Sequence, residues 1–137
     1  MREIVRKAVA KNKYGRVVFN NHDLESHEID TIFCLASFGF DVETIKPSNI
    51  PGSRNPDLLM LGTTWEIKTP TTINRETIAT EFRKAVKQSG GRAVFDIRYT
   101  KNVVMVESYL RDLFKTTRGM RRLMILAQSD ALIDILK

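Results

Sequence analysis

Residues 55–70 of the chain have the sequence NPDLLMLGTTWEIKTP, and the fold can be built outward from this stretch. After Asp57, an apolar run over 58–61 ends at Gly62, Thr63 and Thr64, residues typical of a turn. Apolar and polar residues then alternate over 65–69 until Pro70. The pattern predicts a β-hairpin whose first strand, 57–61, is covered on both faces, as its unbroken apolar run suggests.

This hairpin would bring two acids and a lysine together. Side chains alternate along a strand, so Glu66 and Lys68 share one face, and a tight turn places Asp57 beside them. Burying three charges is costly, and a salt bridge would leave one acid uncompensated. A hard divalent cation compensates both acids. We therefore predict a metal site formed by Asp57, Glu66 and the carbonyl of Ile67, with Lys68 positioning or deprotonating a water molecule or stabilising charge on a phosphate.

The flanking sequence predicts a mixed sheet with helices on its faces, an α/β (α+β) fold. Helical spacing of apolar residues predicts a helix that begins at Asp23 and ends at Gly39. We predict further helices over 2–11, 74–89 and 103–117, and further strands over 16–20, 40–45, 93–97, 123–127 and 131–136. We expect one domain, 1–137, made of a basic N-terminal extension (1–23), a catalytic core (24–97) and a C-terminal helix and strands (98–137).

Charge is unevenly distributed along the 137 residues, whose formal net charge is +6. An acidic segment over 17–67 lies between basic segments over 1–16 and 68–122. Basic flanks suit a polyanion, because neutralising phosphates releases counterions. No segment approaches the ~18 consecutive apolar residues that a membrane-spanning helix needs. Cys34 is the only cysteine, so no internal disulfide forms, and we expect this thiol to be buried.

Other polar residues have weaker signals. His22 and His27 are five residues apart and do not share a helical face, so we expect surface or capping roles. Trp65 faces away from the acids and is expected in the core. Basic residues after Lys68 are candidates for phosphate contacts, and a second basic cluster follows near the C-terminus: Arg75, Arg83, Lys84, Lys87, Arg92 and Arg98, then Arg118, Arg121 and Arg122.

Pro56-Asp57 followed by Glu66-Ile67-Lys68 resembles the signature of the PD-(D/E)XK nuclease superfamily. The predicted order α-β-β-β-α-β over 24–97 is similar to the core of that superfamily, which implies a restriction-endonuclease-like fold. The resemblance also implies a third acid on the helix before the hairpin, for which Glu28 is the best match and Glu25 the alternative. A polar residue on the helix after the lysine, Gln88 or Lys84, would complete the site.

A closer resemblance, over about 24–127, is to toxin domains of contact-dependent growth inhibition proteins. It is carried by the segments around Glu28, 39–42, 55–59 and 65–70, and by 87–89 and 94–98. The resemblance implies an endonuclease that cleaves tRNA in the cytoplasm of a neighbouring cell, and a cognate immunity protein as partner. Because the chain begins with methionine and has no delivery region, we expect an excised toxin domain or a free-standing relative.

Together these inferences predict a nuclease with Asp57, Glu66, Lys68 and Glu28 as catalytic residues. Lys84, Lys87, Gln88 and Arg98 would bind nucleic acid. Mg²⁺ is the expected cofactor, with Mn²⁺ or Zn²⁺ as alternatives. Three other activities stay open. They are a DNA endonuclease of restriction or junction-resolving type, a metal-independent RNase toxin with Glu66 and Lys68 as acid-base residues, and a non-catalytic nucleic-acid-binding module.

Overall fold

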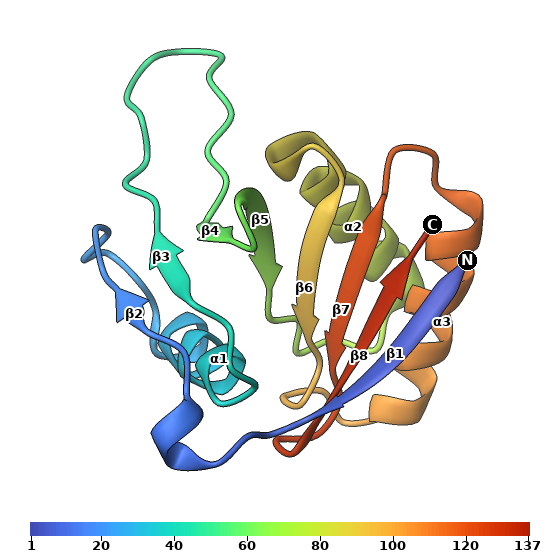
Figure 1. The fold of residues 1–137 in the computed structure, drawn as a ribbon. Coiled ribbons are helices and arrows are strands. Elements are labelled where there is room, and N and C mark those ends of the chain that lie inside the picture. Colours follow the sequence, from blue (N-terminus) through green and yellow to red (C-terminus); the bar gives the residue numbers. More distant parts are fainter.

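A computed structural model describes all residues 1–137 and shows one mixed sheet with helices on both faces (Figure 1). The sheet has eight strands in the order β1-β8-β7-β6-β5-β4-β3-β2. The strands are β1 (Arg2–Lys7), β2 (Val17–Val18), β3 (Val42–Thr44), β4 (Leu58–Met60), β5 (Thr63–Lys68), β6 (Arg92–Asp96), β7 (Arg122–Leu126) and β8 (Ala131–Leu136). The helices are α1 (Ser26–Ala36), α2 (Arg75–Ser89) and α3 (Val103–Thr116), with a short 3-10 turn at Lys11–Lys13.

The order α1-β3-β4-β5-α2-β6 confirms the order predicted over 24–97. Local signals fixed these elements well. The side chain of Asn74 accepts a hydrogen bond from Thr77 N and so caps α2, which ends at Gly90 in the left-handed conformation. Helix α1 begins later than predicted, since Glu25 rather than Asp23 is its N-cap. Glu25 and Glu28 form a capping box there.

The predicted helix over 2–11 is wrong. Residues 2–7 form β1, which pairs with β8 from Arg2 opposite Leu136 to Lys7 opposite Ala131. The two termini of the chain therefore lie side by side at one edge of the sheet (Figure 1). Because Glu3 of β1 also bonds to Arg111 of α3, the N-terminal residues are part of the folded structure at this edge.

The β4–β5 hairpin is confirmed, with two corrections. Its turn is at Leu61 and Gly62, both with positive φ (54° and 74°), one step before the predicted turn. Two positive φ values match the turn that joins twisted antiparallel strands. Strand β4 is covered on only one face, because Leu58 and Met60 are buried whereas Leu59 is 39% exposed.

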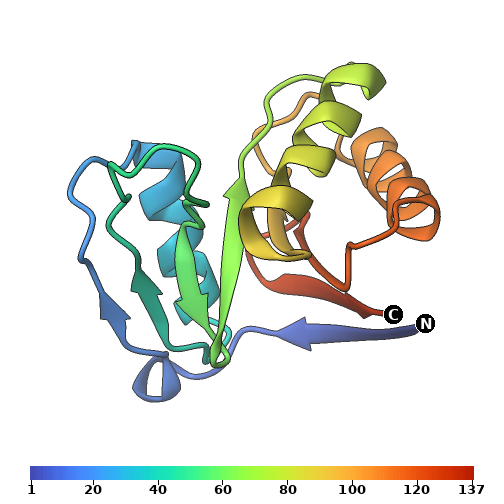
Figure 2. The same ribbon diagram turned by 90° about the horizontal axis from the view of Figure 1, so that it is seen from above.

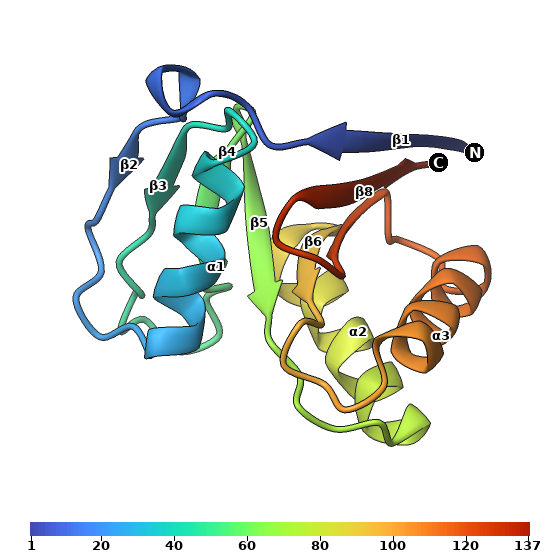
Figure 3. The ribbon, with the colours of Figure 1, turned by 90° about the horizontal axis from the view of Figure 1, so that it is seen from below.

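Strand β5 changes partner halfway along, and this exchange shapes the molecule. Its first half pairs with β4, with Leu58 opposite Trp65, and its second half pairs with β6 from Glu66 opposite Ala93. Figures 2 and 3 show the consequence: α1 lies with β2–β4 on one side of β5, and α2 and α3 lie on the other. Two hydrophobic clusters result, one packed under α1 and one under α2 and α3. The polar site lies where β4 and β6 diverge.

No helix has the length and apolar character that crossing a membrane would require.

Candidate active site

Glu66 and Lys68 lie on the side of β5 that faces α2, as predicted from strand alternation. Trp65 and Ile67 point into the opposite cluster and are buried, which confirms the core position expected for Trp65. The ammonium of Lys68 lies 3.4 Å from Glu66 Oε2. It also lies 3.3 Å from Glu81 Oε2 on α2. Lys68 is thus held between two carboxylates, one on its own strand and one on the helix above.

Asp57 is brought to the same place by the hairpin. Its backbone N–H donates to Trp65 O, and its Oδ2 accepts a 2.8 Å hydrogen bond from Ile67 N. That second bond uses the edge of β5 that β4 has left, so the side chain of Asp57 replaces the missing strand. The carboxyl of Asp57 is close enough to that of Glu66 to disfavour ionisation of Glu66.

Glu66 is the most perturbed group of the site. Burial raises the pKa of Glu66, Asp57 raises it further, and Lys68 opposes both, leaving it at about 8. The residue is only 6% exposed, and its Oε1 is the one buried side-chain nitrogen or oxygen atom in the chain without a hydrogen-bond partner. Such an orphaned oxygen costs free energy unless a proton or a cation satisfies it.

Glu28, at the N-terminal end of α1, lines a cleft that Lys68 also lines. Burial raises the pKa of Glu28, and the nearby charge of Asp57 raises it too, whereas Lys68 and a hydrogen bond from Glu25 lower it. Both acids that were candidates for this helix, Glu28 and Glu25, line a cleft of about 660 Å³ together with Lys68. The rest of the lining is Ile67, Thr69–Thr72, Thr77 and Glu81.

Sequence reasoning missed Glu81. It lies 13 residues after Lys68, in a helix with several other charged residues, and nothing local distinguishes it. Its proximity to Lys68 exists only because α2 runs back along β5. A general rule could have found it: a helix that directly follows a strand packs back along that strand, so its side chains can reach those of the strand.

The predicted nucleic-acid contacts divide into two groups. Lys84 and Lys87 are exposed on α2, and neither has an acidic partner within the chain. The side chain of Gln88 has a structural role, since its Oε1 accepts a hydrogen bond from Asn55 N and ties the long loop before β4 to α2. Arg98 is not among the residues that line the cleft and forms ion pairs with Asp96 and Asp30.

Three further expectations have clear outcomes. Cys34 is buried and free, as expected. In the predicted C-terminal basic cluster, Arg122 is bound to buried Asp134 through two hydrogen bonds, so its charge is already used inside the protein. His22 is exposed, whereas His27 stacks on Tyr99.

The site fits a hard cation with few protein ligands. No group of three or more His, Cys, Asp or Glu side chains lies close enough together to bind a metal. Asp57 and Glu66 would supply two carboxylates, and the carbonyl of Ile67 between them is the third predicted ligand. Mg²⁺ is commonly bound through one or two carboxylates, with water and substrate phosphate completing its shell. The orphaned Glu66 Oε1 is the feature that favours a cation here.

Comparison with known proteins gives two matches. The model of the family described as "Contact-dependent growth inhibition CdiA C-terminal domain" matches residues 54–132, which include β4, β5 and all the helices after them. The chain also resembles a solved structure, described as a CdiA-CT/CdiI toxin and immunity complex from Burkholderia pseudomallei, with a TM-score of 0.66. The alignment has 18% identity and covers 90% of this chain and 100% of the other, and at that identity it concerns the fold alone. No curated protein sequence matches the chain.

Proposed function

Since the chain belongs to the contact-dependent growth inhibition CdiA C-terminal domain family, we propose that it is a toxin domain that hydrolyses phosphodiester bonds in tRNA with the help of a divalent metal ion. The observation that carries the proposal is Glu66, a buried acid with an unpaired oxygen beside Asp57 and Lys68. A core of restriction-endonuclease type is part of the proposal, supported by the order α1-β3-β4-β5-α2-β6.

The metal, Mg²⁺ by preference, would supply Lewis acidity and an activated water. Asp57 and Glu66 would bind it, and its charge would favour the ionised form of Glu66. Because Asp57 Oδ2 accepts a hydrogen bond from Ile67 N, Oδ1 would be the oxygen that binds the metal. A carboxyl that is already oriented and desolvated loses little entropy on binding.

Lys68 would act as a cation in this mechanism. Burial lowers the pKa of Lys68, but the charges of Glu66 and Glu81 raise it more, so the net shift is upward. A lysine with a raised pKa is a poor base at neutral pH. It is well suited to stabilise negative charge on a phosphate in the transition state.

Glu28, across the cleft from Lys68, would orient water or a second substrate group. The exposed Lys84 and Lys87 on α2 would contact the phosphate backbone outside the cleft. We further propose a cognate immunity protein as partner, supported by the immunity protein in the complex of similar fold, and cytoplasm as the site of action.

The test is cleavage by the purified protein of total tRNA and of plasmid DNA, with Mg²⁺ or with EDTA. We expect tRNA fragments only with metal, and none from Glu66→Gln or Lys68→Ala. Glu107→Gln is the matched control, because Glu107 pairs with Arg111 on α3, away from the cleft. Cleavage of the plasmid but not of tRNA would identify DNA as the substrate instead.

A second arm separates hydrolysis by water from an attack by the ribose. In the substrate RNA, the nucleotide on the 5′ side of the cleaved bond is replaced by its 2′-deoxy form. Attack by a metal-activated water continues without the 2′-hydroxyl, whereas a metal-independent RNase that uses the 2′-hydroxyl as nucleophile stops. Cleavage that survives EDTA and is lost on this replacement would contradict the proposal.

A further inference from the structure

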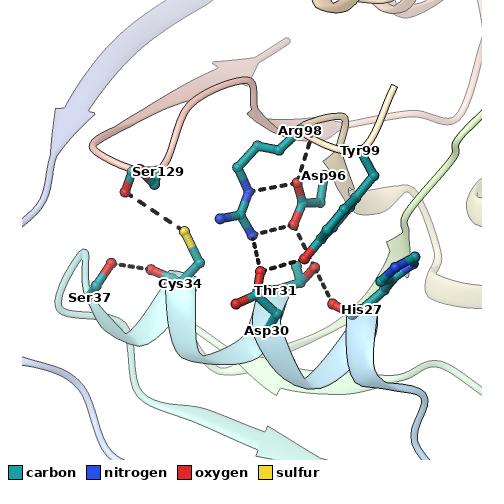
Figure 4. A network of polar contacts seen from close by, with 9 residues as sticks. All are labelled: His27, Asp30, Thr31, Cys34, Ser37, Asp96, Arg98, Tyr99 and Ser129. Atoms are coloured by element: carbon teal, nitrogen blue, oxygen red, sulfur yellow. Dashed lines mark hydrogen bonds and ion pairs between the residues drawn. The ribbon is translucent and has the colours of Figure 1, made fainter. Parts of the chain in front are cut away.

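His27 on α1 and two residues just after β6, Arg98 and Tyr99, form a stack. The rings of His27 and Tyr99 are stacked at 4.2 Å between centroids, with 17° between their planes. The guanidinium carbon of Arg98 lies 5.6 Å from the centroid of the Tyr99 ring. Figure 4 shows Tyr99 between Arg98 and His27, so His27 is the last layer of the stack.

The inner layers are held rigidly. Arg98 binds both oxygens of Asp96, a fully buried carboxylate that also accepts from Thr31 Oγ1 at 2.6 Å. Arg98 also bonds to Asp30 at 2.9 Å, and the hydroxyl of Tyr99 donates to the same oxygen, Asp30 Oδ2. Burial and the bond to Asp30 raise the pKa of Tyr99 to about 12, so the phenol stays neutral.

His27 itself has free polar atoms. Its ring is partly exposed and takes part in no hydrogen bond or ion pair. Its one aromatic contact is the stack with Tyr99. His27 directly precedes Glu28, which lines the cleft beside Lys68. The outermost aromatic layer is therefore one residue from a side chain of the candidate active site.

We propose that His27 is a stacking platform for a base of single-stranded RNA, which positions the nucleotide next to the phosphate in the cleft. The inference rests on the proposed nuclease function and adds a base-binding subsite to it. Proteins bind unpaired bases by stacking them on aromatic rings. A ring already fixed by Tyr99 and Arg98 loses little entropy when a base stacks on it.

The test uses tryptophan fluorescence in the catalytically inactive Glu66→Gln background. Trp65 is the chain's only tryptophan and is fully buried, so a new surface tryptophan reports separately. We expect short oligoadenylate RNA to quench His27→Trp in a saturable manner, and an abasic ribose-phosphate oligomer of equal length to leave it unchanged. The control is His22→Trp, which replaces the only other histidine, an exposed one. It should respond to neither probe.

Binding measurements provide the second arm. We expect His27→Ala to weaken oligoadenylate binding about tenfold, equivalent to about 1.4 kcal/mol, and His27→Phe to restore it. Thermal melts of these variants establish that α1 is folded. Equal binding by His27→Ala and its parent, or equal quenching in His27→Trp and His22→Trp, overturns the stacking proposal.

These results are independent of catalysis. A protein that cuts no nucleic acid but shows the His27→Trp quenching retains the base subsite and loses the proposed function. Cleavage of RNA without that quenching would retain the proposed function and exclude the base subsite.

Discussion

Three acidic side chains are buried in this protein's sheet, and they are treated very differently. Asp96 and Asp134 are completely buried, and each is held by a two-pronged arginine, Arg98 and Arg122, with N–O distances of 2.7–2.9 Å. Asp134 has a second partner in Arg6. Glu66 has one lysine at 3.4 Å, an acid next to it, and an orphaned oxygen.

The difference separates structure from function. An arginine fork satisfies both carboxylate oxygens, and Asp96 and Asp134 also bond to the distant residues Thr31 and Arg6, so both acids hold the fold together. Arg6 and Arg122 also lie over the rings of Phe40 and Trp65, which integrates them into the core. No residue of the chain supplies partners for both carboxylate oxygens of Glu66. The proposed metal site rests on this buried acid, which the protein leaves without a partner for one oxygen.

The sharpest way to break this comparison is to change a cation beside a buried acid at each site and measure cleavage. Lys68→Ala should lower the rate of cleavage about 10³-fold, because it removes the cation proposed to face the phosphate. Single-turnover cleavage of labelled tRNA measures the change. Arg6→Lys, a variant at the Asp134 cluster, should cut at nearly the parental rate per folded molecule. A Lys68→Ala enzyme within tenfold of the parent would contradict the assigned role.

Stability should respond in the opposite way. Asp134→Ala leaves Arg122 and Arg6 without their shared carboxylate, and breaking a buried pair costs about 3–5 kcal/mol. Urea denaturation followed by circular dichroism measures the free energy of unfolding. Asp130→Ala, an exposed acid in the β7–β8 turn, is the control and should change this energy by less than about 0.5 kcal/mol.

Glu66→Gln should stabilise the metal-free protein, and the gain should depend on pH. The native pKa of Glu66 is about 8, against an ordinary value of 4.5. Between those values the unfolded chain releases the proton and the native chain keeps it, so rising pH favours unfolding by about 1.4 kcal/mol per unit. Below pH 4.5 both states are protonated and the penalty disappears.

We therefore expect the free energy of unfolding of Glu66→Gln to exceed that of the parent by on the order of 4 kcal/mol at pH 8 in EDTA. The two proteins should converge near pH 4.5. Urea titrations at a series of pH values measure this difference. A parent that is the more stable protein at pH 8 would show that Glu66 is satisfied within the chain, as Asp96 is.

The sequence predicted contacts between residues that are close along the chain and missed contacts between residues that are far apart. Asp57, Glu66 and Lys68 belong to one hairpin, so alternation and a turn were enough to bring them together. The error at β1 has the opposite cause. Residues 2–7 are a strand because β8, more than 120 residues later, offers them hydrogen bonds, and the local charge pattern contains no trace of that partner.

The same rule explains the side chains around the site. Arg98 and Gln88 are residue types that often contact nucleic acid. In this fold they bond instead to Asp30 and Asn55, which lie in other parts of the chain, and so have a structural role. Glu81 reached the site by the same kind of long-range packing. Sequence identifies which residues can do chemistry, and tertiary contacts decide which of them are free to do it.

The smallest predicted effect tests the state of Lys68 itself. Glu81 is one of the two acids that raise the pKa of Lys68, so Glu81→Gln should lower that pKa and leave Glu66 as the sole partner. If charged Lys68 stabilises the phosphate, activity is lost as pH rises through its pKa, and the variant should lose activity at lower pH than the parent. The rate at neutral pH should fall less than tenfold. Glu76→Gln, an exposed acid on the same helix, is the control. The pH–rate profile distinguishes the two roles, since a Lys68 acting as base would make Glu81→Gln faster at neutral pH.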